Sequence, residues 1–68
     1  MTLSARNHLQ GTIEEITWSE VLVHVTVRVG ENVIESVITR RSAEEMALKK
    51  GDTVTAVIKA TEVMLSKG

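Results

Sequence analysis

The sequence predicts an all-β domain, a small Greek-key barrel of OB type with one short helix. Valine stands at every second position from Val21 to Val29, which is the period of a strand with one buried face. Two more runs rich in β-branched residues flank it, at residues 10–18 and 32–39. A single helix-forming segment, SAEEMALKKGD, separates these runs from a last β-branched region at residues 53–65. This order of elements matches the small OB barrel better than any other architecture we can build.

The first three runs predict a strand followed by a hairpin. The first strand runs from about Gln10 to Trp18, and residues 21–39 form a β-hairpin whose VGEN turn has Gly30 and Asn32 at positions that tolerate turn conformations. The second hairpin strand carries apolar residues on both faces, namely Val33, Ile34, Val37 and Ile38. In so small a protein, this pattern predicts that another subunit covers one face.

The helix is expected to be short and well delimited. Ser42 and Glu45 have the spacing of a capping box, and good helix formers with lysines in the last turn follow them. Gly51 supplies the C-terminal stop.

The last region changes the parity of its apolar positions. These positions are Val54, Ala56, Ile58 and Ala60, and then Val63 and Leu65. We expect a bulge or a sharp bend near Lys59–Glu62, because a one-residue slip would otherwise expose half of the apolar face. A bulge leaves backbone N–H groups unpaired, here near Ala60 and Thr61. The region is then either two strands or one strongly bent pair.

Chain length and composition predict a self-associating domain. The 68 residues are too few for a core that is comfortably stable alone, so we expect one domain, residues 1–68, that oligomerises. There is no cysteine, and His8 and His24 stand apart, so neither disulfides nor a metal site is expected.

Charge and aromatic content argue against several function classes. The formal net charge is −1 with both signs interspersed, so no broad positive field is available to attract nucleic acid. No signal segment and no apolar run of membrane-spanning length is recognisable, which predicts a cytoplasmic protein without a membrane partner. No nucleophile has a base partner at a recognisable spacing, so we expect no enzyme.

Two groups of donors could hold a small anion at the ends of the first and third runs. Ser4, Arg6 and Asn7 precede the first apolar run, and the forked, permanently charged Arg6 suits a tetrahedral oxyanion. A solvated tail is the competing reading. Thr39 and Ser42 flank the expected helix start, where free N–H groups attract anions, although Ser42 is equally well explained as a plain N-cap.

Lys59 provides a third candidate group. It lies in the middle of an apolar run at the parity switch, beside the unpaired amides expected at Ala60 and Thr61, and such amides next to an ammonium form an anion nest. An exposed lysine facing solvent explains the residue about as well. Arg40 and Arg41 either add charge near the helix start or form solvated surface.

Read together, these segments resemble the molbindins, small molybdate-binding proteins built from a single Mop-type domain. The resemblance runs through SARN at residues 4–7, ITRRSAEEMAL at 38–48 and KKGDTVTAVIKATEV at 49–63. It implies a five-stranded OB-like barrel, a homohexamer arranged as a trimer of dimers, and molybdate or tungstate bound at subunit interfaces. No organic cofactor is implied.

The resemblance also implies which residues bind the oxyanion. They are Ser4 and Arg6 from SARN, Thr39 and Ser42 at the helix start, and Lys59 with the backbone of Ala60. Asn7 and Thr61, neighbours of these donors, complete the candidate set. Because molybdate at neutral pH can only accept hydrogen bonds, a pocket of donors without a carboxylate suits it.

Three functions follow as hypotheses. The first is cytoplasmic binding and storage of molybdate or tungstate for homeostasis. The second is an OB-type nucleic-acid-binding module, which needs a basic groove with aromatic platforms, whereas this chain has no Phe or Tyr and one Trp. The third is a purely structural dimerisation module.

Overall fold

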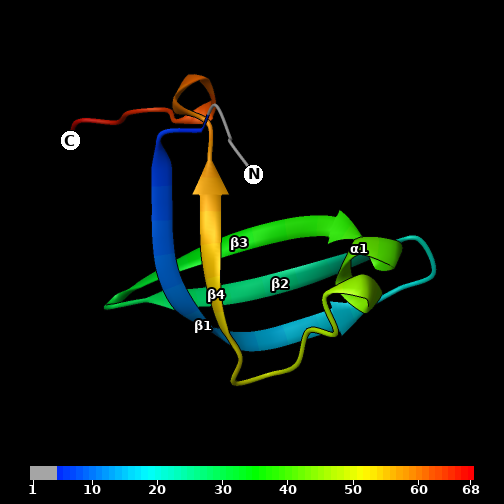
Figure 1. Ribbon diagram of the computed structural model, residues 1–68. Helices are drawn as coiled ribbons and strands as arrows, with labels where there is room; N and C mark the ends of the chain where they lie inside the picture. The colour runs from blue at the N-terminus through cyan, green and yellow to red at the C-terminus, as the bar shows by residue number, and fades with distance from the viewer. Residues whose placement is uncertain (1–4) are drawn as a thin grey trace.

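Four strands form one curled antiparallel sheet in the computed structural model, which describes residues 5–68 (Figure 1). Along the sheet their order is β3-β2-β1-β4. The elements in chain order are β1 (Asn7–Trp18), β2 (Leu22–Val29), β3 (Asn32–Thr39), α1 (Arg40–Glu45), β4 (Thr53–Ile58) and the 3₁₀ turn η1 (Ala60–Glu62). The prediction of an all-β fold with one short helix is confirmed.

Strand β1 belongs to two ladders, and this gives the sheet its curl. Up to Thr12 it pairs with β4, and from there on it pairs with β2. At Gly11 it passes so close to β2 that a Cβ atom would lie 2.5 Å from the carbonyl oxygen of Arg28. Only glycine fits this approach, so Gly11 permits the bend that Figure 1 shows in β1.

A β-bulge interrupts β1 at Glu14, which has no partner on β2. The Glu14 carboxylate accepts hydrogen bonds from the Arg28 guanidinium, and this contact raises the pKa of Arg28. Near Lys59–Glu62, where the sequence predicts a bulge or a sharp bend, the structure has the bend. Strand β4 ends at Ile58 and the chain turns through η1.

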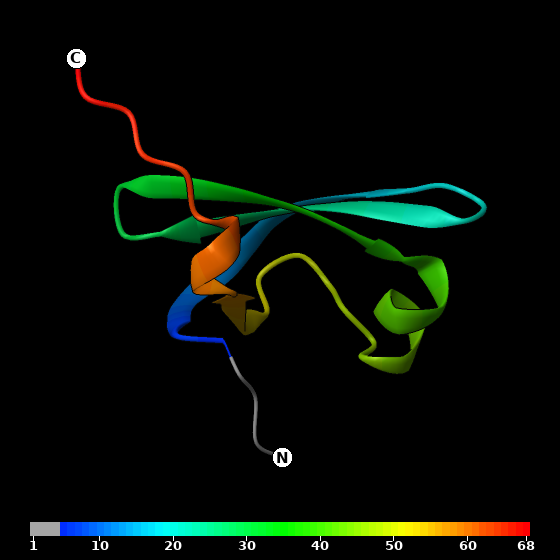
Figure 2. The same cartoon turned by 90° about the horizontal axis from the view of Figure 1, so that it is seen from above.

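Residues 63–68 follow η1 without regular secondary structure, so the described residues contain four strands where five are expected. Val63, Met64 and Leu65 are 47%, 92% and 95% exposed. The segment projects away from the sheet in both views (Figures 1 and 2). Among the described residues, this segment forms no ladder with either edge strand of its own sheet, β3 or β4.

The predicted hairpin is confirmed by the ladder between β2 and β3. Its turn contains Gly30, whose φ of 62° lies in the left-handed region that glycine tolerates. On β3, Ile34 and Ile38 face the inner side opposite valines of β2. Val33 and Val37 lie on the outer side and are 43% and 61% exposed. The apolar character of both faces of β3 is therefore real.

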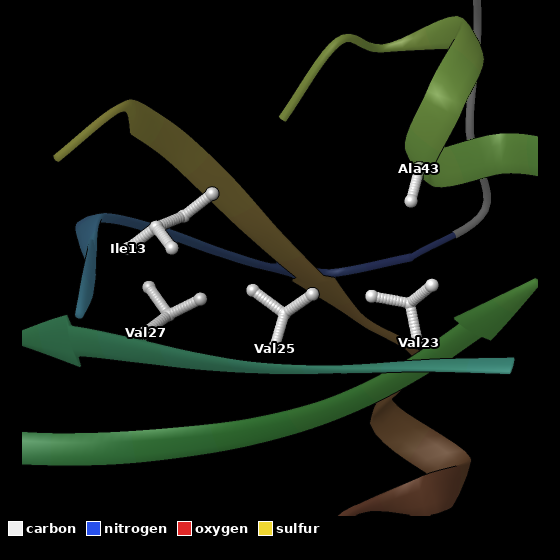
Figure 3. Packing of buried hydrophobic residues seen from close by; sticks show 5 residues of the cluster. All are labelled: Ile13, Val23, Val25, Val27 and Ala43. Carbon is white, nitrogen blue, oxygen red and sulfur yellow. The ribbon is translucent and has the colours of Figure 1, made fainter. Parts of the chain in front are cut away.

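The core lies on the concave side of the sheet. It consists of Ile13, Val23, Val25, Val27 and Ala43, whose side chains converge in Figure 3. Helix α1 covers one end of this cluster through the fully buried Ala43. Burying one stripe of valines against one helix face gives a core of the limited size expected for so short a chain.

Helix α1 differs from its prediction at both ends. Thr39 is the N-cap, and its hydroxyl oxygen accepts from the Ser42 N–H, so the predicted capping box of Ser42 with Glu45 is wrong. Thr39 and Ser42 have the same spacing as that box, one turn earlier. The helix ends at Glu45, and Ala47, with φ 51°, takes the left-handed position that directly follows the helix. Gly51, the predicted stop, also has a positive φ of 95° but lies four residues further along the chain.

An apolar groove of about 450 Å³ opens between β3 and β4, the two edges of the sheet. Ile34 and Ile38 line it from β3, Val54 and Ile58 line it from β4, and Leu48 lines it from the segment after α1. The curled sheet therefore does not close on itself along these two edges. Within residues 5–68, no helix has the length and apolar character needed to cross a membrane.

Candidate functional site

The cations Arg6 and Lys59 adjoin at one end of the sheet. Asn7 pairs with Ile58, so Arg6 and Lys59 are the next residues beyond the end of the ladder between β1 and β4. Both are exposed, and neither takes part in an ion pair among the described residues. Because like charges opposite each other on neighbouring strands repel, an anion between them would stabilise this end of the sheet.

Asn7 and His8 hold the segment that carries Arg6. The Asn7 side-chain Nδ2 donates to the Ile58 carbonyl oxygen at 3.2 Å, so this amide secures the strand end instead of pointing a free donor at a ligand. The His8 Nε2 lies 3.2 Å from the Ala5 carbonyl oxygen. Since a carbonyl only accepts, the His8 Nε2 donates this bond. One contact thus holds the residue next to Arg6, and the other spans Arg6 along the chain.

Two free amides lie beside Lys59. Turn η1 uses the N–H groups of Glu62 and Val63, which donate to the carbonyl oxygens of Lys59 and Ala60. The N–H groups of Ala60 and Thr61 have no such acceptor among the described residues, as expected at the start of a 3₁₀ turn. The free amides predicted here are therefore present, and a turn rather than a bulge provides them.

Thr39 and Ser42 form a second donor pair at the start of α1. The Thr39 hydroxyl donates to the Ser42 hydroxyl oxygen at 2.9 Å and accepts from the Ser42 N–H at 3.1 Å. With this arrangement, the Ser42 hydroxyl keeps its own proton for another acceptor. The pair therefore serves as a helix cap and still offers one donor.

The arginines next to this donor pair are occupied. The Nε atom of Arg40 lies 3.3 Å from the Glu44 carboxylate, and that of Arg41 lies 3.2 Å from the Glu45 carboxylate. Each pair has the i,i+4 spacing of neighbours on one helix face. The surroundings of the Thr39–Ser42 pair are thus close to neutral, because each neighbouring arginine is paired with a glutamate. The positive charge without a carboxylate partner lies at Arg6 and Lys59.

The structure brings the predicted residues together as two clusters and not as one. The charged cluster consists of Arg6, Lys59, Ala60 and Thr61, with Asn7 as its anchor, and the hydroxyl cluster consists of Thr39 and Ser42. They lie at opposite ends of β1, a strand of 12 residues, beside η1 and α1 respectively (Figures 1 and 2). At about 3.3 Å per residue, even a curled strand keeps its ends too far apart for one tetrahedral anion to touch both. Ser4 lies outside the described residues.

Sequence reasoning missed the structural roles of two residues at these ends. Arg40 contacts the ring of Trp18, whose centroid lies 5.8 Å from its guanidinium carbon, and Asn7 secures the strand end as described above. Neither contact leaves a local signal, because each joins segments that are distant in the sequence. Within residues 5–68, no cluster of three or more His, Asp or Glu side chains could hold a metal ion.

Comparison with known proteins shows the family to which this chain belongs. The TOBE domain family matches residues 3–65. Molybdenum-pterin-binding protein 1 of Clostridium pasteurianum is 39% identical over 66 residues, which cover 96% of this chain and 97% of that protein. Sequence similarity thus extends over nearly the whole of both chains.

Solved structures agree with this match. A molybdate-binding protein from Sporomusa ovata superimposes with a TM-score of 0.93 at 34% identity, covering 98% of this chain and 100% of that one. The cytoplasmic molybdate-binding protein ModG, solved with molybdate bound, gives a TM-score of 0.82 at 39% identity, covering 88% of this chain and 43% of that one.

Proposed function

This chain is a Mop-type member of the TOBE domain family, and on that premise we propose that it binds molybdate as an intact oxyanion. The resemblance of the sequence to the molbindins is thereby confirmed. The names of its relatives and structural neighbours, which describe binding of molybdate or of a molybdenum pterin, support the proposal. We propose that the site binds the anion and does not catalyse a reaction.

The observation that carries the proposal is the position of Arg6 and Lys59 as the next residues beyond the Asn7–Ile58 pair, at the end of the ladder between β1 and β4. Both cations lack a carboxylate partner among the described residues, and the free amides of Ala60 and Thr61 lie next to Lys59. A dianion that can only accept hydrogen bonds fits such a site, because charge-assisted bonds to oxyanions are among the strongest in proteins. Tungstate has the same shape and charge and fits the same donors.

We place the complete site at an interface between copies of this chain. One chain keeps its charged and hydroxyl clusters at opposite ends of β1, so a site that uses both must draw the charged cluster from one copy and the hydroxyl cluster from another. The homohexamer that the family resemblance implies would provide such interfaces. Storage or buffering of molybdate in the cytoplasm is the role we assign to the assembly.

Exposed apolar surface supports self-association independently. The groove between β3 and β4 is open, and the apolar residues Val63, Met64 and Leu65 project from the same chain without cover. A strand laid between two free edges would pair with both. We propose that this segment of a second copy supplies the fifth strand of the Greek-key barrel, which residues 5–68 of a single chain do not contain.

Calorimetric titration with molybdate, tungstate, sulfate and phosphate at equal ionic strength tests the function. We expect heat with molybdate and tungstate and little with the smaller sulfate or the partly protonated phosphate. Equal heats for all four anions, or no heat for any, would contradict specific oxyanion binding. The absence of heat together with a stable dimer would instead favour the purely structural dimerisation module.

A further inference from the structure

Trp18, the single aromatic residue of the chain, lies outside the core. It ends β1, is 43% exposed, and faces the guanidinium of Arg40, whose Cζ atom is 5.8 Å from the ring centroid. A cation over an aromatic ring within about 6 Å of its centroid is attracted by the ring. The ring is thus a partner of Arg40 and not part of the buried cluster.

Arg40 links three segments through one residue. Its backbone N–H donates to the Val21 carbonyl oxygen at 2.8 Å, and its Nη1 donates to the Ser19 carbonyl oxygen at 3.2 Å. Its Nε donates to the Glu44 carboxylate at 3.3 Å. The loop between β1 and β2, the Trp18 ring and the first turn of α1 are therefore held together by Arg40.

The hydroxyl cluster lies at the same helix start as Arg40. Thr39 directly precedes it as the N-cap, and Ser42 lies in the same first turn. Because Thr39 and Ser42 bond to each other, a shift of this turn would move both hydroxyls together. Whatever fixes Arg40 consequently fixes the direction in which the free Ser42 proton points.

We infer that Trp18 acts through Arg40 as a positioning residue for the Thr39–Ser42 half of the oxyanion site, an inference that rests on the proposed function. The ligand class is a tetrahedral oxyanion, and Trp18 needs no contact with the anion itself. If the anion binds only one position of the first turn of α1, its apparent Kd rises in proportion as the population of that position falls. Loss of the ring should therefore weaken binding although every donor is still present.

The test measures molybdate dissociation constants by calorimetry in the full-length chain. Trp18→Leu should raise Kd by about two- to fivefold, which corresponds to the loss of one exposed cation–π contact. Trp18→Phe keeps an aromatic face and should stay within about twofold of the parent. Arg41→Gln is the matched control, because Arg41 has the same i,i+4 pairing in the same helix but contacts Glu45 and not the loop between β1 and β2. The Kd of this variant for molybdate should equal that of the parent.

A double-variant cycle separates positioning from a general loss of stability. If Trp18 acts through the hydroxyl cluster, then Trp18→Leu should have less effect on Kd in a Ser42→Ala background than in the parent, because the donor that it positions is already gone. Equal effects in both backgrounds would overturn the inference, as would a Trp18→Leu protein that binds molybdate as tightly as the parent. A parent chain that fails to bind molybdate would instead contradict the proposed function.

Discussion

At the residue scale, the charged cluster brings two positively charged residues, Arg6 and Lys59, close enough to repel each other. The sequence predicts Arg6 and Lys59 as donors, and the pairing of Asn7 with Ile58 makes them neighbours. This repulsion slightly lowers the free energy of unfolding of the ligand-free chain, and it favours the binding of an anion between the two residues. Free and bound proteins should therefore respond oppositely to the loss of one cation.

Replacement of Lys59 tests this opposition. Lys59→Ala should weaken molybdate binding by about 2–5 kcal/mol, the usual cost of removing a charged donor from a desolvated site, measured by calorimetry. The ligand-free protein should unfold at the same or slightly higher urea concentration, because a repulsion is removed. Lys50→Ala, three residues before the start of β4, is the charge-matched control and should leave Kd unchanged. Tight binding by Lys59→Ala would show that the amides near η1 are not part of the site.

Gly11 offers a second test at this scale. In Gly11→Ala the new methyl group would lie 2.5 Å from the Arg28 carbonyl oxygen and within 3 Å of methyl groups of Val27 and Val29. We expect a loss of about 1–3 kcal/mol in the free energy of unfolding, typical of overpacking, measured by urea denaturation. Gly68→Ala, with nothing within 4 Å, should be neutral. An unchanged unfolding midpoint for Gly11→Ala would mean that β1 does not need this close approach.

At the scale of elements, α1 ends in a Schellman motif built on an unfavourable residue. The Leu48 N–H donates to the Ala43 carbonyl oxygen and the Ala47 N–H to that of Glu44, the two bonds that define this motif. Its left-handed position is occupied by Ala47, where glycine is usual. The helix thus carries a local strain that a single substitution can remove.

Ala47→Gly should stabilise the chain by about 1 kcal/mol, because a residue with a Cβ atom pays about that amount in the left-handed region. Thermal or urea unfolding measures the gain. Ala43→Gly is the contrasting variant, because Ala43 is helical and fully buried. This substitution should lower the free energy of unfolding. Destabilisation by Ala47→Gly would show that the positive φ is not a cost to this protein.

Local patterns predict these elements well where one face is buried, and poorly at their ends. The alternation of valines in 21–29 and the Gly30 turn identify the hairpin because period and turn chemistry agree. The sequence predicts the wrong N-cap because Thr39 and Ser42 both qualify as caps. The packing of Ala43 against the sheet, which decides between them, is not visible in the local pattern. The bulge at Glu14 and the partner of Trp18 depend on pairing between distant segments, which no local pattern encodes.

At the scale of the whole molecule, the proposed interface site links molybdate binding to the association of two copies of this chain. A ligand that binds only the assembled form stabilises it by mass action, by about 2.7 kcal/mol per site at a hundredfold excess over Kd. Several interface sites on one oligomer act together. Ligand binding and assembly should consequently be observed as one linked equilibrium.

Molybdate should therefore raise the melting temperature and oppose dissociation on dilution, whereas sulfate at the same ionic strength should do little. Sedimentation velocity over a range of protein concentrations, together with thermal melts in each anion, measures both effects. A chain that remains monomeric while it binds molybdate tightly would place the whole site within one subunit, and the interface proposal would fail.

The separation of the two clusters along β1 has a consequence for mixtures of damaged chains. A chain with Lys59→Ala retains its hydroxyl cluster, and a chain with Ser42→Ala retains its charged cluster, so each lacks a different half of the site. Mixed oligomers of the two should regain intact sites wherever the undamaged halves face each other, and should bind molybdate more tightly than either variant alone. Two defective subunits would then complement each other. Such complementation is possible only if each binding site is built from residues of two neighbouring chains.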